Sequence, residues 1–362
     1  MEAINRQSKA KEIGKKALGI FTIPLLVVVA VLIVCLSSGQ MILTTDVSFY
    51  GFTRYTAVVF LTTIALSINL SSGRFDFSIG SLSTLSSVIA AKITYAMLSG
   101  NGASAPVMLL ISIIVGAALG ALSGTLYVAL KLPPIITSLG VTLIFEGIIY
   151  MISGGRYITT ETSNASMIFF RESWWIHLII IALVLVVIYL VFDRSKFGFN
   201  YKALRAGQNI SVNTGIKEIP NAIICYAICG ALMGTVGFLQ VLPGNQIATS
   251  VLNFGSIGIM FVAFLPMFIG GYIGKYTNDK IGYLIAAICI SLLSSMFALF
   301  NAKTITASIQ SIVTAVLLVG FLIFLNNEQT CKDLVNGTLI KRLVKQHKEK
   351  KNRGENDDKP QE

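Results

Sequence analysis

The chain has 362 residues, of which 54% are hydrophobic and only 12% are charged, whereas an ordinary soluble domain carries about 25% charged residues. This composition excludes a soluble enzyme, a disordered chain and a disulfide scaffold. It predicts an all-α protein that crosses a membrane many times. The formal net charge of +11 is attributed to basic residues in cytoplasmic loops and not to nucleic-acid binding, because no basic run alternates with exposed aromatic residues.

Residues 1–17 form a basic segment, which predicts a cytoplasmic N-terminus ahead of a membrane domain at 18–325. The apolar run at 18–38 is too long for the core of a signal peptide and lacks a small-residue cleavage site, so we expect a retained first span. Nine more apolar runs follow, and Pro266 interrupts the eighth of the ten. These nine lie at 53–70, 79–98, 107–130, 134–153, 175–192, 219–241, 252–274, 281–300 and 305–325.

The distribution of basic residues predicts the orientation of the ten spans. With the N-terminus inside and the spans alternating, 23 of the 28 Lys and Arg residues fall in cytoplasmic segments. Basic residues are retained on the cytoplasmic side of a membrane, so both ends of the chain are expected there. Residues 326–362 then form a charged cytoplasmic tail, either as a basic helix at the membrane surface or as a solvated end.

The segment 71–91 after the second span combines a turn with a helix start. Gly73 permits a turn, and Asp76 or Ser78 can cap the third span. Gly80 and the serines that follow permit close helix packing. The segment is explained by structure alone, but a carboxylate near a membrane pathway also fits a role in transport.

The segment 130–155 contains a proline pair and a carboxylate at membrane depth. Pro133 and Pro134 predict the end of the fourth span and the start of the fifth. Glu146 lies in the middle of the fifth span, where a carboxylate is expected to face protein or a wet cavity. Contact with a transported solute and an internal hydrogen bond both remain open for Glu146.

The inner loop 193–218 has about 26 residues, more than a reversal of the chain requires. Its composition favours a short helix that docks on a partner, although a solvated basic connection is the alternative. Phe197 and Leu204 are the expected apolar anchors, and Lys202 and Arg205 supply charge around them. The glycines are expected to bend the backbone at both ends of the helix, and the remaining candidates follow in the same stretch: Gly198, Ala206, Gly207, Asn209 and Gly215.

The segment 229–275 is rich in glycine, and Gly230, Gly234 and Gly237 are expected along one side of the seventh span. Glycines and prolines farther on predict interrupted helices. The chain has no P-loop and no C-x-x-C pair, and it has only two histidines. We therefore expect no metal site, no cofactor and no ATPase site in the chain itself.

These four segments together resemble the permease family of ribose/galactoside-type ABC importers. Residues 73–80 (GRFDFSIG) are similar to G-G-[IL]-D-L-S-[VI]-G, and residues 132–140 (LPPIITSLG) to L-P-P-F-[IV]-x-T-L-G. The loop 195–216 and residues 229–237 match the next two family motifs. The chain departs from the family pattern in four places. Arg74 replaces a glycine, and Glu146 stands where many relatives carry arginine. Asn253 and Ser256 lie where an acidic pair is usual, and Leu265-Pro266 replaces a double glycine.

The resemblance implies a permease subunit that works with a second permease, identical or homologous, with two ATP-binding subunits and with an extracytoplasmic solute-binding protein. The loop 193–218 would couple the permease to the ATPase. Spans 2–5 and 7–10 would form two inverted halves, and residues 75–82 and 253–259 are faintly alike. The expected solute is a sugar or nucleoside. The alternatives are a branched-chain amino-acid type ABC permease and a secondary transporter or channel; no paired nucleophile and base supports an intramembrane enzyme.

Overall fold

A computed structural model describes residues 2–39, 41–44, 46–97, 104–159, 165–244, 246–247, 249, 252–299 and 307–327. Residues 1–306 form one compact unit and residues 307–362 a second. The second unit contains a single described helix, α14 (Ala307–Asn326). The predicted tail at 326–362 lies outside the described residues apart from its first two positions.

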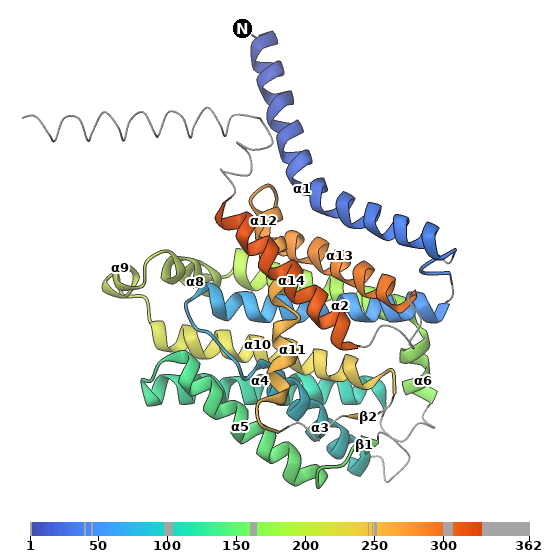
Figure 1. The fold of residues 1–362 in the computed structure, drawn as a ribbon. Helices are drawn as coiled ribbons and strands as arrows, with labels where there is room; N and C mark the ends of the chain where they lie inside the picture. The colour runs from blue at the N-terminus through green and yellow to red at the C-terminus, as the bar shows by residue number, and fades with distance from the viewer. Residues whose placement is uncertain are drawn as a thin grey trace, which may run out of the picture. The chain divides into compact units, whose positions relative to one another are not determined.

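The first half of the larger unit consists of long helices joined by short connections (Figure 1). The first helix continues without a break from the basic N-terminal segment into the predicted first span and contains Pro24. The helices are α1 (Glu2–Ser38), α2 (Asp46–Ser71), α3 (Ile79–Met97), α4 (Ala105–Leu130) and α5 (Pro134–Ser153).

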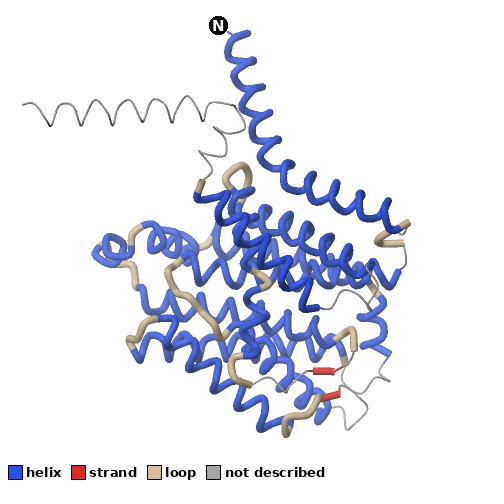
Figure 2. Tube along the Cα trace, viewed as in Figure 1, coloured by secondary structure: helices blue, strands red, loops and turns tan. Residues whose placement is uncertain are grey.

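The second half is more interrupted. It comprises α6 (Ala165–Glu172), α7 (Trp174–Tyr189), the π-helical segment η1 (Leu190–Arg194), α8 (Lys196–Ala206), α9 (Gln208–Asn213), α10 (Glu218–Val241), the 3-10 turn η2 (Gly255–Ile257), α11 (Gly258–Phe261), α12 (Phe264–Gly274) and α13 (Asp279–Leu299). The short strands β1 (Ile158–Thr159) and β2 (Gln246–Ile247) pair antiparallel. Helices α8 and α9 lie at one end of the long helices, and α6 with the two strands lies at the other (Figures 1 and 2).

Within the part of the chain that the structure describes, eight helical segments are long and apolar enough to cross a membrane. They are Gly19–Ser38, Ser48–Ser71, Ala105–Leu130, Pro134–Ser153, Trp174–Arg194, Glu218–Val241, Gly255–Gly274 and Asp279–Phe297. The two other predicted spans are also helical, as α3 and α14, although the apolar part of α14 is the shorter stretch Gln310–Asn326.

Helix α3 is not among these apolar segments, and it contains several serines. Ser81, Ser83 and Ser86 are each completely buried inside the protein. The Ser86 hydroxyl donates to the carbonyl oxygen of Ser83 at 2.9 Å. Because neighbouring parts of the protein surround residues 79–91 of α3, the serines in this part need no match to a hydrocarbon environment.

The predicted eighth span at 252–274 is broken, but not at Pro266. The break lies between Phe261 and Phe264, where α11 ends and α12 begins. Pro266 is the third residue of α12. A proline is tolerated in a first helical turn because its missing N–H would have no helical partner there.

A ladder of small residues holds α4 against α10. A Cβ atom on Gly116, Gly120, Gly230 or Gly234 would overlap backbone atoms of the facing helix. The Ser112 hydroxyl donates to the carbonyl oxygen of Gly234 at 2.7 Å. Small residues at this spacing let two helix backbones approach closely.

Gly237, which was expected on the same side as Gly230 and Gly234, faces a different neighbour. Its Cβ position lies against the carbonyl oxygen of Ser83 in α3. Seven residues make almost two turns of helix, so Gly237 and Gly230 lie on nearly the same side of α10 but at different heights along it. The glycine-rich side of α10 is therefore shared between α4 and α3.

Candidate functional site

The turn before α3 is organised by Asp76. Gly73 has φ +72°, which lets the chain reverse after α2. The Asp76 side chain is 2% exposed. Its Oδ1 accepts hydrogen bonds from the backbone N–H of Ser78 at 2.9 Å and from the Ser78 hydroxyl at 2.6 Å. Its Oδ2 accepts from Asn69 Nδ2 at 3.2 Å. Asp76 therefore fixes the residue that directly precedes α3.

Burial raises the pKa of Asp76, whereas the hydrogen bonds from Ser78 and Asn69 act in the opposite direction. The environment of this carboxyl group is closed on all sides. Ser78 is completely buried, and its hydroxyl lies 3.4 Å from the hydroxyl of Ser123 in α4. The arrangement suits a structural anchor between α2, α3 and α4.

Helix α5, which begins at Pro134, places Glu146 beside the start of the interrupted eighth span. Helix α4 ends at Leu130, Lys131 adopts a left-handed conformation with φ 53°, and α5 begins at Pro134 directly after Pro133. Glu146 lies 12 residues into the helix, about 18 Å along its axis. The side chain is completely buried.

Glu146 binds the start of the interrupted eighth span. Its Oε2 accepts from the backbone N–H of Phe254 at 3.0 Å. Its Oε1 accepts from the N–H and the hydroxyl of Ser256, at 3.0 and 2.6 Å. Asn253 and Phe254 have left-handed backbone conformations, with φ 58° and 66°, and Asn253 is exposed. Glu146 thus satisfies free N–H groups at the beginning of η2, as a helix cap does.

The two breaks share one arrangement. In each, a carboxylate oxygen binds the N–H and the hydroxyl of a serine that is followed by Ile and Gly: Ser78 at the first break and Ser256 at the second. They are also adjacent, since a Cβ atom on Gly80 would overlap the carbonyl oxygen of Ser256. The faint likeness of 75–82 to 253–259 was the sequence signal, but it did not indicate that Glu146 supplies the second carboxylate.

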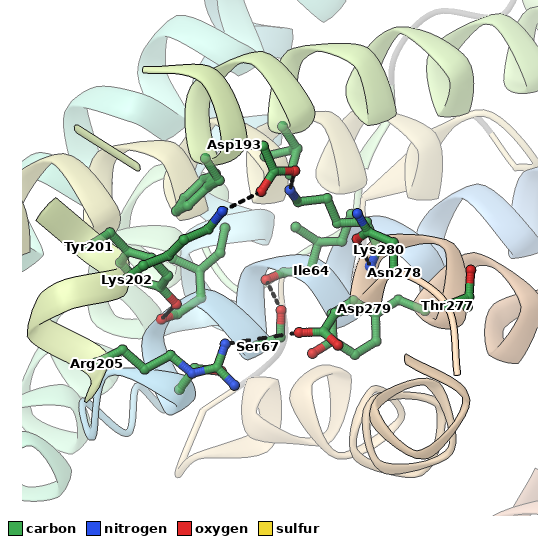
Figure 3. A pocket seen from close by; sticks show the side chains of 15 residues that line it. Ile64, Ser67, Asp193, Tyr201, Lys202, Arg205, Thr277, Asn278, Asp279 and Lys280 are labelled. Atoms are coloured by element: carbon green, nitrogen blue, oxygen red, sulfur yellow. Dashed lines mark hydrogen bonds and ion pairs between the residues drawn. The ribbon is translucent and has the colours of Figure 1, made fainter. Parts of the chain in front are cut away.

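The inner loop is tied to the helix ends around it. Asp193 in η1 forms ion pairs with Lys202 of α8, at 2.7 Å, and with Lys280 of α13 (Figure 3). Arg205 of α8 lies 4.0 Å from the Asp279 carboxylate at the start of α13. These groups line a pocket of about 320 Å³, which also reaches the end of α2.

Tyr201 adds a contact between α8 and the core. Its hydroxyl donates to the carbonyl oxygen of Ile68 in α2 at 2.9 Å. The Tyr201 side chain is 7% exposed, and its ring packs edge-on against that of Phe192. Burial raises the pKa of Tyr201, so its hydroxyl stays a hydrogen-bond donor. Helix α8 is therefore seated on α2, η1 and α13 at once.

The structure shows where the expected anchors of the inner loop lie. Leu204 is 7% exposed and packs inside the larger unit, and the ring of Phe197 lies 5.6 Å from that of Phe192. Lys202 and Arg205 pair with acidic groups of the same chain. The exposed apolar side chains are instead Phe199, Ile210 and Val212, at 62%, 74% and 43%. The pattern of residue types did not show which side of α8 faces the core.

The glycines of the loop have three different roles. Gly215 alone has a left-handed backbone, with φ +92°. Gly198 lies inside α8, where a Cβ atom would overlap the backbone of Phe192. Gly207 is extended, with φ −177°, and has room for a side chain. Ala206 is exposed; the Asn209 side chain lies outside the described part of the structure.

Arg74 joins the first motif to the start of α10. It is 4% exposed, and its Nη2 lies 3.6 Å from Glu218 Oε1. Gln208 of α9 donates to the same oxygen at 2.7 Å. The residue that departs from the family glycine therefore contacts the end of the inner loop.

No group of three or more His, Cys, Asp or Glu side chains able to hold a metal ion occurs among the residues that the structure describes. Residues 48–322 match the family of branched-chain amino acid transport system permease components. The chain belongs to this permease family. Among curated relatives of this permease is the galactofuranose transporter permease protein YtfT of Escherichia coli strain K12, 23% identical over 248 residues, which cover 66% of this chain and 68% of the relative.

Two further relatives widen the comparison. The L-arabinose transport system permease protein AraH of the same strain is 24% identical over 276 residues, 74% of this chain and 78% of its own. The nucleoside ABC transporter permease protein NupB of Lactococcus lactis subsp. cremoris strain MG1363 is 26% identical over 235 residues, 59% of this chain and 62% of its own. No solved structure matches the chain.

Family membership confirms the class of protein that the motifs predicted. The permease is a multi-pass protein of the cytoplasmic membrane and the transport component of a binding-protein-dependent ABC importer. It is not itself an enzyme, since ATP hydrolysis in such importers belongs to a partner subunit.

Proposed function

We propose that this permease imports a monosaccharide or a nucleoside. The printed names of its relatives support this class, since they specify galactofuranose, L-arabinose and nucleosides. The family description favours branched-chain amino acids as the second candidate. Uptake by cells that express the complete importer separates the two: radiolabelled ribose or uridine should accumulate, and accumulation of labelled leucine alone would overturn the sugar or nucleoside assignment.

The permease assembles with a second permease subunit, two cytoplasmic ATP-binding subunits and an extracytoplasmic solute-binding protein. Ten spans with both termini in the cytoplasm would place 23 of the 28 basic residues inside. In that orientation α8 and α9 face the ATPase and the strand pair faces the binding protein. The ion pairs at the α8 end support an aqueous boundary there.

Helices α8 and α9 are the coupling element that contacts the ATPase. The exposed apolar side chains of Phe199 and Ile210 support this role, because burying their apolar surface against a partner would be favourable. A few apolar anchors commonly dominate such an interface. The core-facing residues Tyr201 and Leu204 instead hold α8 on the permease.

The observation that carries the coupling proposal is the position of Asp193. Its carboxylate lies between Lys202 of α8 and Lys280 of α13, and it stands at the end of α7 (Figure 3). If the ATPase displaces α8, these ion pairs would therefore transmit the displacement to both α7 and α13. Rigid movement of packed helices of this kind alternates access to a membrane pathway.

The two halves of the permease are inverted repeats, spans 2–5 and 7–10. The matching carboxylate–serine contacts at Ser78 and Ser256 support this relation, because they lie at the start of the second span of each half. In the first half Asp76 precedes the serine in sequence, whereas in the second half Glu146 reaches across from α5.

Coupling is tested with Phe199→Asp and Ile210→Asp in the purified complete importer. Both side chains are exposed, so the permease should still fold, while ATPase association and solute uptake fall together. The matched control is Phe169→Asp, since Phe169 is 51% exposed on α6 at the opposite end. Normal ATPase association in both α8–α9 variants would show that this surface is not the docking site.

Transmission is tested separately with Asp193→Asn. The change removes the charge that holds both lysines but preserves the size of the side chain. We expect the ATPase subunits to remain bound and ATP hydrolysis to continue, while uptake falls. Unchanged uptake in Asp193→Asn would exclude the ion-pair bridge as the path of transmission.

A further inference from the structure

A cavity lies at the end of the helices opposite α8 and α9. It has a volume of about 790 Å³ and opens between the start of α2, the α6–α7 junction and the end of α10. Six of its lining residues carry charged or aromatic side chains: Tyr50, Arg54, Arg171, Glu172, Trp174 and Trp175. None of these residues belongs to α8 or α9 or to the chain breaks at Ser78 and Ser256.

Arg54 lies in the wall of this cavity and within the apolar segment Ser48–Ser71 of α2. Its Nη1 donates to the carbonyl oxygen of Leu239 at 3.3 Å, but its Nε is buried without a hydrogen-bond partner. Among the described residues, no carboxylate pairs with Arg54. An uncompensated guanidinium at this depth is costly, so it indicates a counter-anion that enters from outside the chain.

Tyr50 lies one turn before Arg54 on the same helix and lines the same cavity. Its side chain is 9% exposed, and its hydroxyl is buried with no hydrogen-bond partner. The ring is held from behind by His177, whose centroid lies 5.1 Å away in an edge-on arrangement. Two buried donors from one helix, both unsatisfied, therefore face one space.

The other lining residues complete a site for an amphipathic anion. Arg171 lies 3.6 Å from Glu172, and it is 38% exposed, so its charge is available at the rim. Trp174 and Trp175 are 38% and 44% exposed at the beginning of a membrane span. Tryptophan is enriched at this boundary, where its ring contacts both apolar chains and polar headgroups.

We propose that this cavity binds a phosphate group, which accepts hydrogen bonds from Arg54 and Tyr50 while the body of the ligand rests against Trp174 and Trp175. Phosphate oxygens suit donors that converge from several directions, and arginine binds them with two parallel N–H groups. The cavity is larger than an inorganic ion requires. The source is an anionic phospholipid headgroup or a soluble phosphate ester.

The experiment measures the melting temperature of the full chain in detergent as a function of added ligand. The additions are phosphatidylglycerol, phosphatidylcholine, inorganic phosphate and, at equal ionic strength, acetate. Variants are Tyr50→Phe and Arg54→Gln. Arg156→Gln is the control, because Arg156 is exposed beside β1, lies outside the cavity and carries the same charge.

Stabilisation by phosphatidylglycerol above phosphatidylcholine supports the site with a lipid as its source. Stabilisation by inorganic phosphate above acetate supports it with a soluble ester. In either case the half-maximal ligand concentration should rise about tenfold in Tyr50→Phe, which loses a neutral hydrogen bond. It should rise roughly 10- to 100-fold in Arg54→Gln, which loses a charge-assisted hydrogen bond. It should be unchanged in Arg156→Gln.

Because Tyr50→Phe removes a hydroxyl that has no partner in the protein, this variant should fold normally even if Arg54→Gln does not. The proposal is overturned if acetate stabilises the chain as well as phosphate and phosphatidylglycerol do. It is also overturned if neither phosphate source stabilises the chain, or if the ligand response of Tyr50→Phe equals that of the unmodified protein.

Discussion

The contacts of Glu146 allow a graded prediction of stability. Glu146→Ala removes the acceptor of three hydrogen bonds and leaves the backbone N–H groups of Phe254 and Ser256 without a partner. Each buried donor left unpaired costs about 1–3 kcal/mol. Ser256 is buried, so its unpaired N–H predicts a loss of about 1–3 kcal/mol, before any effect of the empty space left behind. The N–H of Phe254 adds less, because this residue is 38% exposed and its hydrogen bond is only partly buried.

Glu146→Gln should cost much less than Glu146→Ala. The amide oxygen can replace Oε1, which accepts both hydrogen bonds from Ser256. The amide nitrogen would then face the N–H of Phe254, so that only this partly buried hydrogen bond is lost, at about 1 kcal/mol. Melting of the full chain, followed by size-exclusion chromatography after heating, should rank the proteins as unmodified, Gln and then Ala.

The control is Glu172→Gln, which removes a carboxylate that is 68% exposed and should leave the melting temperature unchanged. A melting temperature for Glu146→Ala equal to that of the unmodified protein would refute the capping role. A Gln variant less stable than the Ala variant would also refute it, because hydrogen-bond acceptance would then not be the function of this side chain.

Other expectations follow from local geometry. Asp76→Asn retains an acceptor for Ser78 and should cost about 1 kcal/mol of stability, whereas Asp76→Leu should reduce the yield of folded protein, as measured by size-exclusion chromatography. Gly230→Ala introduces a methyl group into the α4 backbone and should cost about 1–3 kcal/mol in a melting experiment. Gly215→Ala should lower the melting temperature because φ is +92°, whereas Gly207→Ala should maintain or raise it. A cysteine at position 199 should react with impermeant maleimide only after the cells are opened; labelling in intact cells would contradict the orientation.

Short-range features of the sites could be predicted from the sequence. Asp76 binds a residue two positions away, so the residue types alone indicate the turn. The proline pair at 133–134 likewise marks the end of one helix and the start of the next. Nine of the ten predicted spans are apolar runs that coincide with continuous helical segments. The remaining span, at 252–274, is broken near its centre.

Long-range contacts could not be predicted in the same way. Glu146 and Ser256 are 110 residues apart, and no local pattern relates them. Which side of α8 faces the core depends on Phe192 and Ile68, which lie in other elements. For this reason Leu204 was predicted as an anchor, although the exposed positions are Phe199 and Ile210.

The burial of α3 affects how the orientation of such a chain is determined. A hydropathy count that omits α3 finds five spans before the α8–α9 segment, whereas a count that includes it finds six. One missing span reverses the side of the membrane assigned to every later segment. The error cancels only at the C-terminus, if the count also omits α14, whose stretch Gln310–Asn326 is apolar but shorter than the other spans. Agreement about the two ends of the chain therefore says nothing about the middle, and a topology reporter placed between α5 and α10 is the informative one.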